Sequence, residues 1–188
     1  MPRRPGVVLD PRDAGEFIAG YKEVLFRVQG VEERDDERTL ETLVAGRRRA
    51  TENPLVLERA ISELEATKQP PNGEVLAAIR SLIVADWVYV RDLKNYSVFV
   101  HASGDFALGV LGLTQPVRDI VGGAGAAIEV GVVRYRGRYV CDGLVSRIIQ
   151  LGPSFRRSFS DAYRMLRKEG RFEATCTHNN RMQRARDA

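Results

Sequence analysis

The spacing of the apolar residues changes twice along this chain, and that change limits the folds it can adopt. Over residues 14–84, apolar residues recur at the three- and four-residue spacing of amphipathic helices. Between Trp87 and Ile149 they alternate among β-branched, aromatic and glycine residues, as in short strands. Helical spacing returns from about Pro153 to Glu169. We therefore predict an α+β fold: N-terminal helices packed on a small, strongly bent antiparallel sheet or barrel, closed by a C-terminal helix.

Start and stop signals divide the first part into four helices. An apolar stripe predicts the first from about Ala14 to Gln29. The second ends at arginines 47–49, whose charges suit the C-terminal turn of a helix. Asn53 and Pro54 are typical of the start of a third helix, and the proline-rich segment 69–73 precedes a fourth.

The C-terminal helix is predicted to end at Gly170, a suitable residue beyond a helix C-terminus. Its spacing places six residues on or near the buried side: Phe155, Phe159, Ala162, Tyr163, Met165 and Leu166.

Five short antiparallel strands are predicted between the two helical parts, the last two joined by a tight turn at Arg136-Gly137. Tyr135 then faces Arg138, and the pairing continues backwards through residues 128–135 and 138–149. Gly143 would face Val130 across this pair. One face of the hairpin collects Ile128, Val130, Val132, Cys141 and Val145.

The length of 188 residues suits one compact domain or two small subdomains. We predict a helical subdomain over residues 1–84, a barrel-like subdomain with its closing helix over residues 85–173, and a mobile basic tail over residues 174–188. No apolar run reaches the roughly 20 residues of a membrane span, and no apolar signal core follows the N-terminal arginines. These features predict a cytoplasmic protein without membrane contact.

Charge divides unevenly between the two halves. Residues 1–84 hold 13 Lys and Arg against 15 Asp and Glu, whereas residues 85–188 hold 16 against 10. Lys94 and Lys168 are the only lysines in the basic half, so nearly all of its positively charged residues are arginines. Guanidinium groups match phosphates and carboxylates, which makes an anionic partner a reasonable hypothesis.

Two segments resemble a family of uncharacterised bacterial proteins over roughly residues 85–173. The first is Tyr89-Val-Arg-Asp-Leu-Lys-Asn-Tyr-Ser-Val-Phe99 with the later Gly109-Val-Leu-Gly-Leu-Thr-Gln-Pro116. The second is Tyr135-Arg-Gly-Arg-Tyr-Val-Cys-Asp-Gly-Leu144 with the closing helix. The resemblance implies a shared fold and no activity. Relatives tend to carry tyrosine where this chain has Cys141, which argues against a nucleophilic role for that thiol.

No assembled catalytic or metal motif is present. The histidines, His101 and His178, lie at a predicted hairpin tip and in the predicted tail, and nothing places either beside Cys141. Cys176 and His178 supply two of the four ligands that a closed zinc site needs. Asp142 lacks an identifiable second carboxylate for hydrolysis. We predict no catalytic residue, no metal and no cofactor.

Arginines beside tyrosines form the most functional-looking set. The predicted nucleic-acid-binding residues are Arg134, Tyr135, Arg136, Arg138, Tyr139, Arg156 and Arg157. Cations between aromatic side chains can bind single strands through phosphates and base stacking. The same pattern also suits an ordinary solvent-exposed rim.

Three functional classes therefore stay open. The first is a non-enzymatic protein that binds RNA or single-stranded DNA. The second is a small hydrolase with a site between helices and barrel, and the third is a protein–protein regulatory module. The sequence predicts no oligomeric state.

Overall fold

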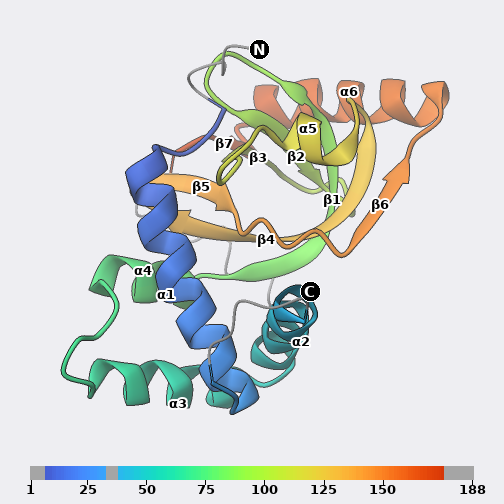
Figure 1. Cartoon of the computed structure of the whole chain (residues 1–188). Coiled ribbons are helices and arrows are strands. Elements are labelled where there is room, and N and C mark those ends of the chain that lie inside the picture. Colours follow the sequence, from blue (N-terminus) through green and yellow to red (C-terminus); the bar gives the residue numbers. More distant parts are fainter. Residues whose placement is uncertain (1–6, 33–37, 176–188) are drawn as a thin grey trace. The chain divides into compact units, whose positions relative to one another are not determined.

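The computed structural model describes residues 7–32 and 38–175, which form two compact units (Figure 1). The helical unit contains residues 11–82, and the strand unit contains residues 7–10 with the chain from Ile83 onward. The N-terminal segment joins the strand unit because Val8 forms a parallel bridge with Gly112. No helix among the described residues combines the length and apolarity needed to cross a membrane.

The helical unit confirms the four predicted helices with changed ends. They are α1 (Pro11–Gln29), α2 (Thr39–Glu52), α3 (Pro54–Glu65) and α4 (Gly73–Arg80). Helix α2 continues past arginines 47–49, where we predicted its end, to Glu52, which pairs with Arg48 at 2.9 Å. Pro54 occupies the first turn of α3 as predicted, and the Asn72 side chain caps α4 by accepting from the Glu74 amide.

The described residues of the strand unit form seven strands and two helices. In chain order these are β1 (Ile83–Asp92), β2 (Ser97–His101), β3 (Ala107–Leu111), α5 (Val117–Val121), β4 (Ala126–Tyr135), β5 (Arg138–Cys141), β6 (Arg147–Gln150), α6 (Pro153–Lys168) and β7 (Phe172–Glu173). Sheet structure thus begins at Ile83, ahead of the predicted Trp87.

The strands close into a ring. They follow the order β1-β2-β3-β5-β4, and β4 pairs back onto β1 from Ile83↔Val132 to Tyr89↔Ala126. The structure confirms the predicted α+β fold, and most strand pairs are antiparallel as predicted, but the sheet as a whole is mixed. Strand β3 runs parallel to β5 and to β7. Sequence alternation identifies strands but not their partners, because direction is set by residues far apart in the chain.

Alternation along the strands creates two apolar faces. Trp87, Tyr89 and Phe99 face the inner side of the ring, where they pack with Val117 and Val121 of α5. The opposite face of β1, β2 and β3 carries a second set of residues and packs against α6. That outer cluster contains Val88, Val90, Val98, Val100, Ala107, Tyr163 and Leu166. Helix α6 therefore covers the outer face of three strands.

The β4–β5 hairpin confirms the predicted register as far as Cys141. Tyr135 pairs with Arg138 and Val132 with Cys141, around a turn whose two residues both have positive φ. The predicted continuous strand to Ile149 was wrong, and so was the pairing of Gly143 with Val130. The Asp142 carboxylate accepts hydrogen bonds from the Gly131 and Leu144 amides, which interrupts the ladder before β6.

Helix α6 matches its predicted range, and Gly170 follows it with φ +68°. Tyr163 and Leu166 are buried as predicted, and Phe159 packs beside them. Phe155 and Met165 were assigned wrongly, since they are 63% and 58% exposed. The outer face of the strands contacts only a narrow stripe of the helix, which leaves these two side chains beyond its edges.

Candidate functional site

Helix α6 carries far more positive than negative charge. It holds five cations (Arg156, Arg157, Arg164, Arg167 and Lys168) and one carboxylate, Asp161. That carboxylate pairs with Arg164 at 2.8 Å. The outward sides of α6 therefore expose an excess of positive charge next to the strands that its buried side covers.

One further cation joins this helix from β1. Together with four residues of α6 it forms what we call the basic face: Arg91, Arg156, Arg157, Arg167 and Lys168. None of these five side chains forms an ion pair with any part of the chain that the structure describes. The basic face is thus a set of cations whose charge the fold leaves uncompensated.

A β-bulge places Arg91 on this face. Tyr89 pairs with Phe99, yet Arg91 pairs with Val98, so Val90 is an additional residue in β1. Regular alternation would direct residue 91 to the inner side with Trp87 and Tyr89. The extra residue instead directs Arg91 outward, where its guanidinium carbon lies 6.0 Å from the ring centre of Tyr163.

Gly125 positions Arg156. A Cβ atom on Gly125 would lie 2.6 Å from Cγ and 2.8 Å from Cδ of Arg156, so the arginine stem crosses bare backbone. The φ of Gly125 is +79°, a conformation that other residues rarely adopt. Arg156 Nε also donates to the Leu151 carbonyl at 2.6 Å. Backbone and glycine together hold this side chain in one place.

These two arginines line the same pocket between β1 and α6, with a volume of about 230 Å³. Its walls are the apolar side chains of Val88, Val90 and Phe159, and Ala124, Gly125 and Ser160 complete the lining. The pocket lies where β1 extends beyond the start of β4, since the Gly125 amide donates to the Tyr89 carbonyl. We call it the α6–β1 pocket.

The arginines at the predicted hairpin occupy a different place. Arg134 and Arg136 are exposed, and Arg138 is half-buried and donates to the Asn95 carbonyl at 3.0 Å. The hairpin tip follows the last residue of β4, whereas Gly125 and Arg156 lie at its first residue. Strand β4 has ten residues, so its two ends lie roughly 30 Å apart along an extended strand. The predicted site residues therefore form two groups, one at each end of β4.

Both tyrosines of the predicted site are buried, each 2% exposed. The Tyr139 hydroxyl donates to the Glu173 carboxylate at 2.7 Å. The Tyr135 ring lies under the Arg136 guanidinium at 5.5 Å. Stacking of a base on either ring would require the ring to leave the core, so the arginines are the accessible part of this group.

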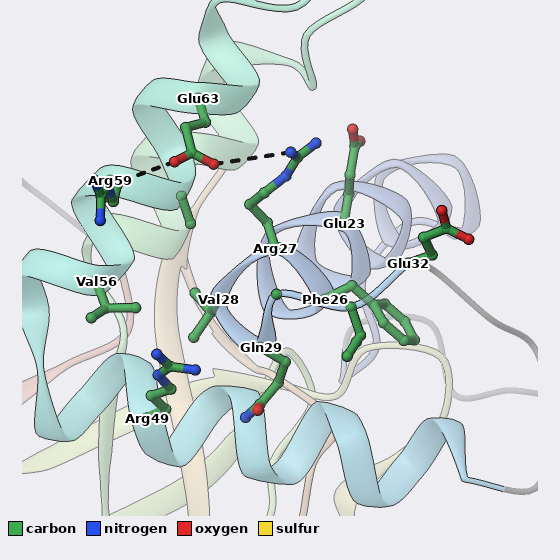
Figure 2. Close-up of a pocket in the computed structure, with 13 residues that line it drawn as sticks. Glu23, Phe26, Arg27, Val28, Gln29, Glu32, Arg49, Val56, Arg59 and Glu63 are labelled. Carbon is green, nitrogen blue, oxygen red and sulfur yellow. Dashed lines mark ion pairs between the residues drawn. The ribbon is translucent and has the colours of Figure 1, made fainter.

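A larger pocket of about 900 Å³ lies in the helical unit (Figure 2). Its charged lining residues balance, with Arg27, Arg49 and Arg59 against Glu23, Glu32 and Glu63. Figure 2 shows Glu63 between two of these arginines, 3.9 Å from Arg27 and 3.7 Å from Arg59. This balanced surface offers no excess charge for an anionic or a cationic ligand.

The other candidate groups have structural surroundings. Cys141 is buried in the inner core, which supports the predicted structural role. Asp142 is occupied by two backbone amides, and His101 contacts the Ser103 hydroxyl at 2.7 Å. Cys176 and His178 lie outside the described residues. Within the described ranges, no three His, Cys, Asp or Glu side chains gather as metal ligands.

Sequence reasoning found Arg156 and Arg157 but missed Arg91 and the pocket. One signal was present: an arginine at residue 91, two positions after Tyr89, falls where alternation predicts an inward side chain. A cation at such a position requires either a bulge or the end of the strand.

Comparisons with known proteins give no relative for this chain: no family model, curated protein or solved structure matches it.

Proposed function

We propose that this protein binds single-stranded nucleic acid, RNA or DNA, through the basic face of its strand unit. The observation that carries the proposal is the uncompensated charge of the five residues of the basic face. Guanidinium groups bind phosphate oxygens in a fork geometry, and binding releases counterions from the nucleic acid. Arg167 and Lys168 lie in the last turn of α6, where cations also suit the helix dipole, so the charges of Arg91, Arg156 and Arg157 support the proposal most directly.

The strand order supports the same proposal. A ring ordered β1-β2-β3-β5-β4, closed by β1 and β4 and with a helix between β3 and β4, resembles the five-stranded barrel of oligonucleotide- and oligosaccharide-binding folds. Such folds serve many functions, so the resemblance adds weight only beside the basic face. In those folds the outer face of strands 2 and 3 contacts the ligand.

Helix α6 covers that outer face in this protein, with Tyr163 and Leu166 against the strands. A bound strand therefore runs along the side of α6, over Arg91 and Arg156, instead of across the sheet. Arg134, Arg136 and Arg138 at the far end of β4 form a second phosphate contact for longer strands. In this proposal Tyr135 and Tyr139 support the hairpin and do not stack with bases.

Fluorescence anisotropy of a labelled oligonucleotide tests the proposal. We expect binding that weakens steeply between 50 and 200 mM salt. Replacing Arg91, Arg156 and Arg167 together by Gln should reduce the slope of log affinity against log salt by about two units, at about 0.7 per phosphate contact on single strands.

The matched control replaces three arginines of the helical unit, Arg48, Arg59 and Arg80, by Gln. This control removes the same number of positive charges, but each of these arginines pairs with a carboxylate. The salt slope should therefore stay close to that of the wild type. Absence of binding at 50 mM salt, or equal loss in both triple variants, would reject the proposal.

A further inference from the structure

The α6–β1 pocket has apolar walls, and phosphate binding by the basic face does not require such walls. We infer that it is a subsite for one unstacked base of the bound strand, with Arg91 and Arg156 holding the phosphates on either side. This inference rests on the proposed function and adds a contact that is independent of charge.

The size of the pocket indicates a part of a ligand and not a whole one. Its volume of about 230 Å³ is below the roughly 300–1,000 Å³ of sites that enclose complete small molecules. A single flat ring attached to a longer chain fits this description. The remainder of the ligand then lies outside the pocket, where the basic face is.

The walls suit a flat aromatic ring. Val88 and Val90 supply one apolar side from β1, and the half-buried Phe159 supplies an aromatic side from α6. Gly125 contributes backbone without a side chain, which leaves room at the rim. Every base presents a π face to an aromatic ring, so such a subsite tolerates different sequences.

Different local features position the two arginines at the pocket. The bulge in β1 directs Arg91 outward, and Gly125 with the Leu151 carbonyl holds the Arg156 stem. Two like charges at one small pocket repel each other, and a bound anion relieves that repulsion. A nucleotide unit brings both elements together, because its base is uncharged and its phosphates are anionic.

Filling the pocket without changing charge tests the inference. Ser160 lines the pocket, whereas Ser158 is exposed on the same helix. Ser160→Phe should weaken binding of an oligothymidylate about 5- to 150-fold, the range for loss of one stacked base. Ser158→Phe adds the same ring on the exposed side of α6 and should leave binding within about twofold of wild type, because no proposed contact changes.

An abasic phosphodiester of the same length separates base from phosphate contacts. The Ser160→Phe substitution should weaken binding of oligothymidylate but leave binding of the abasic strand nearly unchanged, a difference that isolates the pocket. Equal effects of Ser160→Phe on both strands, or no effect on either, would overturn the inference while the proposed function stands. If wild-type protein binds neither strand, the proposed function fails first.

This comparison requires folded variants, and thermal melting establishes whether each variant is folded. If Ser160→Phe melts below the assay temperature, Phe159→Leu replaces it, since leucine keeps the wall apolar and removes the ring. Phe159→Leu should again weaken binding of oligothymidylate more than binding of the abasic strand. Equal weakening of both strands would count against the subsite.

Discussion

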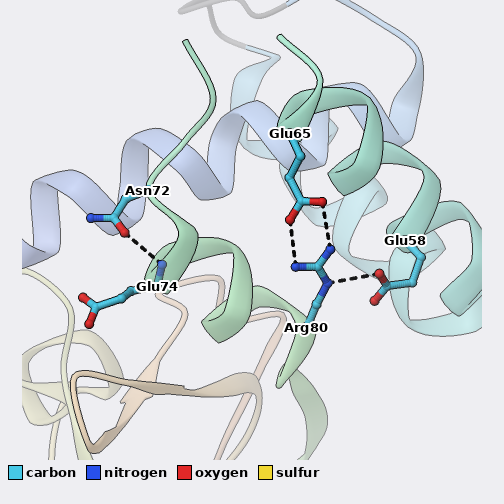
Figure 3. A network of polar contacts seen from close by, with 5 residues as sticks. All are labelled: Glu58, Glu65, Asn72, Glu74 and Arg80. Carbon is cyan, nitrogen blue, oxygen red and sulfur yellow. Dashed lines mark hydrogen bonds and ion pairs between the residues drawn. The ribbon is translucent and has the colours of Figure 1, made fainter. Parts of the chain in front are cut away.

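Arginines of the helical unit and arginines of α6 are the same residue type in opposite electrostatic surroundings. In the helical unit Arg80 donates to both Glu65 oxygens, at 3.1 and 3.3 Å, and to Glu58 at 3.1 Å (Figure 3). Its hydrogen bond to Glu65, and then the bond to Glu58, raises the pKa of the Arg80 guanidinium. On α6, Arg156, Arg157 and Arg167 meet no carboxylate of the described chain.

The local sequence explains much of this difference. In α2 and α3 a glutamate follows an arginine by four residues, which gives the pairs Arg48–Glu52 and Arg59–Glu63. In α6 the residue four positions after Arg156 is Ser160, and four after Arg164 is Lys168. Asp161 lies four positions after Arg157 but pairs with Arg164 instead. Paired arginines contribute to the fold, whereas unpaired ones are available to a ligand.

The largest expected effect concerns what holds α6 in place. Leu166 is buried against the outer face of the strands, so Leu166→Ala should lower the free energy of unfolding by about 2–5 kcal/mol. Chemical denaturation measures this change. Met165→Ala, at an exposed neighbouring position, is the control and should change stability by less than about 0.5 kcal/mol. Equal losses would mean that α6 is not held by apolar packing.

Gly125→Ala should have the next largest effect, because a side chain at φ +79° is strained and its Cβ would contact the Arg156 stem. The left-handed conformation alone disfavours alanine by about 1–2 kcal/mol. Denaturation and oligonucleotide titration together check the prediction, since moving Arg156 should also weaken binding. The control is Gly152→Ala, where φ is −67° and no atom lies within 4 Å of a new Cβ. Retention of full binding by Gly125→Ala would show that Arg156 needs no fixed position.

The buried tyrosines give a prediction that separates stability from binding. Tyr139→Phe removes the hydroxyl that donates to Glu173 and should lower the free energy of unfolding by about 1 kcal/mol. Oligonucleotide affinity should not change, because the ring is buried. Loss of affinity without loss of stability would instead assign Tyr139 to the binding surface.

Neutralising charges should affect the two units differently. Arg80→Gln breaks pairs with Glu65 and Glu58 and should destabilise the protein by about 0.2–1 kcal/mol, less at high salt, because these groups are partly exposed. Arg157→Gln on the basic face should not destabilise the protein, since Arg157 forms no ion pair with the described chain and lies near the N-terminus of α6, where the helix dipole disfavours a cation. Thermal melting at low and high salt compares the two variants. Destabilisation by Arg157→Gln equal to that by Arg80→Gln would show that the basic face is structural.

The smallest expected effect is a pH dependence from His101. Burial lowers the pKa of His101 from its usual value of 6.5, and the nearby Asp105 and Asp86 only partly oppose this. The unfolded chain therefore binds the proton first as pH falls through about 6.5, so stability decreases below that pH and is fully present above it. Melting curves across pH 5–8 should show this slope, and His101→Gln should flatten it. An unchanged slope in the variant would assign the dependence to other groups.

Local sequence determined the parts of this protein that depend on neighbouring residues. Apolar spacing predicted α1 and α6, Asn53-Pro54 predicted the start of α3, and Arg136-Gly137 predicted the hairpin register as far as Cys141. The excess of arginine in the second half follows from composition alone. The helices and the hairpin follow from repeat geometry, capping and turn chemistry, which act over a few residues.

Only the tertiary structure decided which residues meet across long distances in the chain. The parallel pairing of β3 with β5, the interruption at Asp142, and the burial of Tyr135 and Tyr139 all depend on non-local partners. The same is true of Arg91, which the bulge opposite Val98 directs outward to the face covered by α6. The sequence pattern shows which side chains of a strand share one face. Contacts between distant segments determine whether that face packs in the inner core, packs under α6 or is exposed to solvent.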